Sequence, residues 1–231
     1  MLRRIEELFG PIPAGESPSP RIRTEPVQSG ERRITLEGPG ETTYIQFAHR
    51  APAASHPDFY PLTVLDSLLT GPSNLNMFGG GISNKTSRLY RALVEGELAV
   101  SVHGGLQATI DPFLHTITIV VRPNGSPEAV VARLAEEIKR LQDAPPPPEE
   151  LRRAVKQARA LFAYGSESIT NQAFWMGFSE MFSSYDWFTS YLENMSAVTP
   201  EDVQRVAQTY LRPQNRIYGI YLPAGNGEVS Q

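Results

Sequence analysis

Histidine is the side chain in this sequence most suited to metal chemistry, and the chain has four: His49, His56, His103 and His115. Two imidazoles four residues apart on one helix can bind a zinc ion whose water is activated by a neighbouring glutamate. No two of these histidines have that spacing, and the absence of cysteine excludes thiolate zinc sites and disulfides. A site made by His103 and His115 from adjacent strands is an alternative, but single histidines on a half-exposed sheet are the favoured interpretation.

A second candidate is the segment that runs from Gly79, Gly80 and Gly81 to Lys85 and Thr86. Phosphate-binding loops of the G-x-x-x-x-G-K-[ST] type follow a strand and place their lysine directly after a glycine. Here the lysine follows an asparagine, and the segment follows a predicted helix. These two differences exclude a phosphate-binding loop of this type. Serine nucleophile motifs are absent as well.

The composition is that of a globular protein, with 231 residues, 40% hydrophobic and 20% charged. This length allows one large domain or two small ones. The net charge of −4 comes from interspersed signs, which argues against nucleic acid and membrane surfaces as partners. No apolar run approaches the roughly 20 residues that cross a bilayer. These features predict a soluble protein of bacterial type, with the cytoplasm as the favoured location and a signal sequence in an upstream segment as the open alternative.

Turn residues and apolar periodicity predict five strands. Two short strands, 33–37 and 43–49, flank a Gly-Pro-Gly turn and are expected to pair with each other. Two longer strands, 98–108 and 113–121, flank an Asp-Pro turn, and a last strand covers 216–222. Both faces of the longer strands carry apolar residues, so helices are expected to cover at least one face of the sheet.

The other periodic segments predict helices, and the segment 199–202, Thr-Pro-Glu-Asp, predicts a capped helix start. Strands and helices segregate along the chain, so the predicted fold class is α+β rather than doubly wound. The aromatic residues near Trp175 are interpreted as core packing, with a partner interface as the alternative. The predicted helices cover residues 2–9, 58–69, 86–94, 126–141, 149–162, 171–182, 186–195 and 199–211.

Four motifs occur in a recognisable order along the chain: residues 58–69, Ser-Arg-Leu-Tyr at 87–90, Leu-Ala-Val-Ser-Val at 98–102 and Ala-Val-Thr-Pro-Glu-Asp-Val at 197–203. Together they resemble the C-terminal domain of insulinase/pitrilysin-type zinc metallopeptidases, the inverzincins. The resemblance extends over residues 2–223. It implies an α/β roll, a mainly antiparallel sheet covered by helices on one side, and a zinc site in a homologous preceding domain.

The resemblance also gives a meaning to residues 1–28. Residues 2–13 resemble the last helix of the zinc-bearing domain and the linker that leaves it, and a Pro-rich stretch continues to residue 28. The expected organisation is therefore a terminal helix with linker over 1–28 and one α+β peptidase-like domain over 29–231. On this interpretation the chain is the second half of a longer polypeptide.

The site residues implied by the resemblance bind substrate, with no catalytic residue and no metal ligand among them. Gly79, Gly80 and Gly81 resemble the glycine-rich loop of the non-catalytic alpha subunit of mitochondrial processing peptidase, which implies a role in presenting substrate. Arg88 and Tyr90 follow in the Ser-Arg-Leu-Tyr motif. For Arg88, an ion pair that anchors its helix is the alternative.

Two positions depart from the pattern of active members. Those members usually place an arginine after the Ser-Arg-Leu helix and a tyrosine seven residues further on, which hold the substrate backbone or the oxyanion. With one residue deleted in this sequence, the matching positions are Val94 and Val100, and neither side chain donates a hydrogen bond.

The resemblance thus implies a catalytically silent C-terminal domain of a zinc metalloendopeptidase, inactive alone, that forms part of the wall of a peptide-binding chamber. Its partners would be a homologous zinc-bearing domain or subunit, which holds the zinc, and a peptide substrate. Whether the chain also forms a homo-oligomer is open. The alternatives are a structural or regulatory non-catalytic subunit of the same family and, least favoured, an unrelated α+β binding domain.

Overall fold

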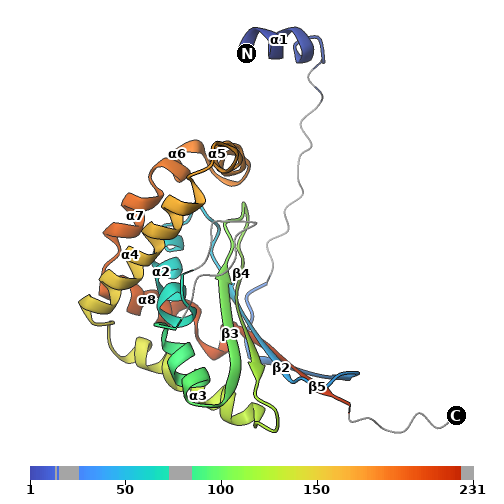
Figure 1. Cartoon of the computed structure of the whole chain (residues 1–231), viewed down its shortest axis with the longest axis vertical. Coiled ribbons are helices and arrows are strands. Elements are labelled where there is room, and N and C mark those ends of the chain that lie inside the picture. The colour runs from blue at the N-terminus through green and yellow to red at the C-terminus, as the bar shows by residue number, and fades with distance from the viewer. Residues whose placement is uncertain (14, 16–25, 73–84, 225–231) are drawn as a thin grey trace, which may run out of the picture.

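A mixed five-stranded sheet, with helices packed against one of its faces, forms the body of the protein (Figure 1). The computed structural model describes residues 1–13, 15, 26–72 and 85–224. The predicted α+β class and the one-sided helical cover are confirmed. The strands are β1 (Arg32–Gly38), β2 (Tyr44–Ala51), β3 (Ala99–Leu106), β4 (Phe113–Val121) and β5 (Arg216–Pro223).

The strand order is β1-β5-β2-β4-β3, and only the β1–β5 pair is parallel. The mainly antiparallel sheet is therefore as predicted, but the predicted pairing of the first two strands is wrong. Strand β5 lies between them, because its own alternating apolar residues pair with both neighbours. Gly40, at φ +129°, helps the chain to turn past β5, whose Tyr221 hydroxyl donates a hydrogen bond to the Pro39 carbonyl at 2.7 Å.

The period-two alternation of β2 and β4 decides which face of the sheet is covered. One side chain in two lies beneath the helices and is buried, while its neighbours face the other side. The buried residues are Ile45, Phe47, His49 and Ala51 in β2, and His115, Ile117, Ile119 and Val121 in β4.

Helix α2 lies at the centre of the helical layer, in contact with β3, α4, α7 and α8. Eleven of its twelve residues are buried, as expected of a helix that is apolar nearly all round. The helices are α1 (Leu2–Phe9), α2 (Phe59–Thr70), α3 (Pro127–Asp143), α4 (Pro148–Gly165), α5 (Ile169–Phe182), α6 (Tyr185–Thr189), α7 (Tyr191–Ala197) and α8 (Pro200–Tyr210), with a π-helical segment η1 (Tyr90–Glu95) and a 3₁₀ turn η2 (Pro213–Asn215). None of the described helices has the length and apolar character to cross a membrane.

Aromatic side chains join the outer helices to α2. The Trp187 indole of α6 donates a hydrogen bond to the Ala54 carbonyl at 3.1 Å and packs edge-on against Phe182 of α5, with ring centroids 4.8 Å apart. The interpretation of these aromatics as core packing is confirmed, because Trp175, Phe182 and Trp187 are all buried.

Helix α1 is amphipathic, as predicted, but it buries none of its residues. Its residues Leu2, Leu8 and Phe9 are more than half exposed, and Ile5 is 46% exposed. Figure 1 shows α1 apart from the sheet and its helices. The division of the chain at residue 28 stays a prediction.

Gly104 lets α2 approach β3 closely. A Cβ atom on Gly104 would lie 2.5 Å from the side chain of Thr70 and 2.8 Å from a carboxylate oxygen of Asp66, both in α2. Gly104 therefore marks a close approach between the backbone of β3 and helix α2. Its neighbour Gly105 has no atom within 4 Å of the corresponding position.

We predict that Gly104→Ala lowers the free energy of unfolding by about 1–3 kcal/mol, because the methyl group must push α2 away from the sheet. Gly105→Ala is the matched control and should change stability by less than about 0.5 kcal/mol. Urea unfolding followed by circular dichroism measures both. Equal effects of the two substitutions would contradict this account of the packing.

Candidate functional site

The predicted substrate-binding residues fall into two groups. Gly79, Gly80 and Gly81 lie outside the described residues. Arg88 and Tyr90 lie where η1 begins, and the Arg88 guanidinium forms a two-pronged ion pair with Glu150 of α4, at 2.8 and 2.6 Å. Arg88 thus has the anchoring contact that was its alternative role.

Tyr90, Val94 and Val100 do not form a polar site among the described residues. The side chains of Tyr90 and Val94 are partly buried against the core. Val100 lies at an irregularity in the pairing of β3 with β4 and is 56% exposed. A role for Arg88 and Tyr90 in binding substrate stays a prediction.

The alternative metal site of His103 and His115 is wrong, because the two side chains lie on opposite faces of the sheet. His115 is fully buried beneath α2, whereas His103 is exposed and pairs with Thr118 on the other face. Within the described ranges, no group of three or more histidine, aspartate or glutamate side chains is placed to hold a metal ion.

A buried polar cluster instead connects α2 to the sheet. The His115 Nε2 atom lies 2.8 Å from a carboxylate oxygen of Asp66, which also accepts a hydrogen bond from the Thr70 hydroxyl at 3.0 Å. The His49 ring lies 6.2 Å from that of His115, and in the described part of the chain neither of its nitrogens has a hydrogen-bond partner.

His49 is therefore a neutral imidazole in the core. Burial lowers its pKa to about 3, and the charges of His115 and Arg216 act in the same direction. A neutral ring without partners packs as an apolar group, so this histidine serves the core and not a metal.

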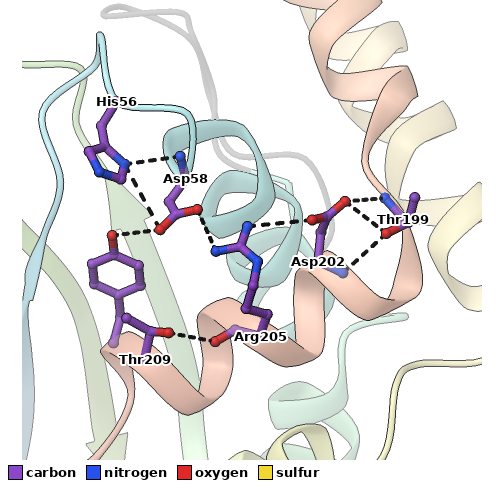
Figure 2. Close-up of polar contacts among 7 residues, drawn as sticks. His56, Asp58, Thr199, Asp202, Arg205 and Thr209 are labelled. Carbon is purple, nitrogen blue, oxygen red and sulfur yellow. Dashed lines mark hydrogen bonds and ion pairs between the residues drawn. The ribbon is translucent and has the colours of Figure 1, made fainter.

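Asp58 is the centre of a polar junction between the start of α2 and helix α8 (Figure 2). Its carboxylate accepts hydrogen bonds from the Arg205 guanidinium at 2.6 Å and from the Tyr210 hydroxyl at 2.9 Å. The His56 Nδ1 atom accepts the backbone N–H of Asp58 at 3.1 Å. Burial and the Asp58 carboxylate raise the pKa of Tyr210, so its hydroxyl keeps its proton as a donor.

The same junction includes the capped start of α8. The Thr199 hydroxyl accepts the backbone N–H of Asp202 at 3.1 Å, and the Asp202 carboxylate accepts the backbone N–H of Thr199 at 3.2 Å. The predicted cap is therefore confirmed. The Thr199 hydroxyl also donates a hydrogen bond to the Asp202 carboxylate. This hydrogen bond lowers the pKa of Asp202 by more than burial raises it. Arg205 lies 3.4 Å from the other oxygen of Asp202 and so joins the two aspartates.

The face of the sheet without helices presents an apolar row across β1, β5 and β2. Leu36, Tyr221 and Tyr44 are register partners, and the two tyrosine rings lie 6.3 Å apart. Leu36 is 60% exposed, Tyr44 45%, and Ile34 in the same strand as Leu36 is 50% exposed. This uncovered face is the candidate functional surface, because exposed apolar rows of this kind mark contact sites.

Comparison with known families identifies the fold. The family model described as the peptidase M16 inactive domain matches residues 1–158. The chain belongs to this family. No match is found among curated proteins.

Several solved structures share the fold of this chain. A protease from Helicobacter pylori superposes with a TM-score of 0.84 at 19% identity, over 96% of this chain and 51% of that one. The inactive peptidase domain of a candidate zinc protease from Bordetella parapertussis has a TM-score of 0.69 at 24% identity, over 82% and 97%. A peptidase M16 inactive domain from Pseudomonas fluorescens has a TM-score of 0.69 at 19% identity, over 90% and 47%. The chain thus spans about half the length of the first and third of these structures.

Sequence reasoning missed the pairing between Asp58 and Arg205, which are 147 positions apart. The resemblance could have indicated this contact, since two of its four motifs, 58–69 and 197–203, meet at the junction. In this M16 inactive domain those motifs hold two helices together.

We predict that acid destabilises the domain through His49. The unfolded chain takes up a proton on this histidine near pH 6.5, whereas the folded chain does so only near pH 3. The contribution of His49 to the free energy of unfolding is therefore fully present above pH 6.5. It falls by about 1.4 kcal/mol for each pH unit below that value. His49→Leu should therefore reduce the loss between pH 6.5 and 4.5 by about 2–3 kcal/mol in urea titrations.

His103→Leu is the control, because that histidine is exposed. It should keep the full wild-type loss of stability with acid. A wild-type loss in His49→Leu as well would show that His49 does not couple proton binding to folding.

We predict that Asp58→Ala lowers the free energy of unfolding by about 1–3 kcal/mol, because it leaves the Arg205 and Tyr210 donors without their acceptor. Asp143→Ala removes an exposed i,i+4 ion pair with Lys139 and should cost less than about 0.5 kcal/mol. Thermal unfolding by calorimetry compares the two. A cost for Asp58→Ala no greater than that of the control would refute the junction.

Proposed function

We propose that this M16 inactive domain is the catalytically silent half of a zinc metalloendopeptidase. It would form part of the wall of a peptide-binding chamber, beside a homologous domain or subunit that holds the zinc and cleaves the peptide. The observation that carries the proposal is the uncovered face of the sheet, where no helix of the described residues lies over the row of Leu36, Tyr221 and Tyr44.

This face suits a peptide better than a small ligand. An antiparallel sheet usually presents polar residues on the face that meets water. Here large apolar side chains from three adjacent strands form a row, and an extended peptide could place its own apolar side chains along it. Phenol rings provide contact area with little loss of conformational freedom on binding.

Two valines support a non-catalytic role, because they stand where active family members usually have an arginine and a tyrosine. Val94 and Val100 offer neither charge nor a hydrogen-bond donor to a developing oxyanion. The described residues also do not group into a set of metal ligands. We therefore assign the zinc to the partner domain, where it would activate water for attack on the peptide bond. The Bordetella parapertussis relative, an inactive peptidase domain of a candidate zinc protease, is consistent with this division.

We predict that the chain alone cleaves no casein, and that cleavage appears when it is co-expressed with the zinc-bearing domain encoded upstream or in the adjacent reading frame. A double substitution, Leu36→Ala with Tyr44→Ala, should lower kcat/KM of the assembled enzyme about tenfold through loss of apolar contact. Cleavage of a quenched fluorescent peptide gives the rates.

Ile110→Ala is the matched control, because Ile110 is 61% exposed but lies outside the sheet. It should leave kcat/KM unchanged. Stoichiometric zinc in the isolated chain, with chelator-sensitive cleavage, would overturn the proposal. A stable assembly without zinc or cleavage would instead favour the structural or regulatory subunit.

A further inference from the structure

A groove on the helical side of the molecule is lined mainly by charged residues. It lies where η1, α3 and the start of α4 meet, and its volume is about 510 Å³. Five arginines and three glutamates line it, which leaves a local charge of +2. The whole protein carries −4, so the local charge of the groove has the opposite sign to the net charge of the chain.

The glutamates hold some of these arginines in place. Glu137, whose side chain is 6% exposed, accepts hydrogen bonds or ion pairs from Arg140 at 3.0 Å and Arg133 at 3.3 Å. Glu150 is occupied by the two-pronged contact of Arg88. Two of the three carboxylates are thus neutralised within the groove, and the arginines that bind them have little freedom to move.

Two further arginines have no such contact. Arg91 of η1 and Arg153 of α4 line the groove and are exposed, and in the described part of the chain the side chain of neither has a hydrogen-bond or ion-pair partner. A guanidinium group without a partner, beside others already fixed, is suited to a carboxylate, which it binds through two parallel hydrogen bonds.

We propose that this groove binds an acidic peptide segment, with Arg91 and Arg153 as the residues that contact its carboxylates. The groove is formed by helices, and the uncovered sheet face is on the other side of the sheet, so this is a second surface, independent of the proposed chamber wall. The segment would belong to a partner polypeptide, and its signature is two or more Asp or Glu residues.

The lining favours a peptide over a nucleotide or single-stranded nucleic acid. Those ligands are held by aromatic rings that stack on their bases. No aromatic side chain is among the described residues that line this groove. The groove instead provides guanidinium groups, which carry positive charge and can each donate two hydrogen bonds. A run of carboxylates can accept both.

The test uses the full 231-residue chain and a fluorescein-labelled peptide of eight glutamates, with fluorescence polarisation at 50 and 300 mM NaCl. We expect binding at low salt that weakens at high salt, since these contacts are exposed. The double substitution Arg91→Gln with Arg153→Gln should weaken binding about tenfold, as two exposed ion pairs are lost.

Arg159→Gln with Arg212→Gln is the matched control, because both arginines are exposed, carry the same charge and lie outside this groove. It should change the affinity by less than about twofold. An equal loss in both double variants would overturn the proposal, because it would reflect net charge alone. So would absence of binding at 50 mM NaCl, or tighter binding of an eight-nucleotide single-stranded DNA at the same residues.

Discussion

The contact between α2 and the sheet is the constraint on which most of the structure depends. Helix α2 is buried on nearly all sides, so every other helix of the layer packs around it or around its neighbours. It can lie this close because Gly104 has no side chain and because Asp66 satisfies both His115 and Thr70. A carboxylate in an apolar interior requires such partners, and here they lie on the sheet and on the helix itself.

The same contact gives the two faces of the sheet different side chains. On the covered face, histidines that in another setting could bind a metal are used as buried packing groups. On the other face, aromatic and aliphatic side chains remain uncovered. The domain thus has the fold of an M16 inactive domain, and its described residues do not gather into a set of metal ligands.

The sequence predicted the elements well and their arrangement less well, for a physical reason. Alternation in β4 and the cap of α8 depend on residues two or three positions apart, so local patterns were sufficient. The place of β5 depends on pairing with a strand at the other end of the chain, which no local pattern encodes. Among the site residues, the Arg88 pair was foreseen as an alternative. The Asp58 junction and the arginine groove were missed, since their residues become neighbours only in the fold.

The position of β5 between β1 and β2 has a consequence for how the protein is made. Arg32 of β1 is the register partner of Ile217, 185 positions later in the chain. During synthesis β1 and β2 emerge early, yet β1 has no strand to pair with until β5 leaves the ribosome. Long-range pairing of this kind slows folding and leaves strand edges open in the meantime. The sheet is therefore completed by its final strand, and a nascent chain shorter than this carries β1 as an unpaired segment.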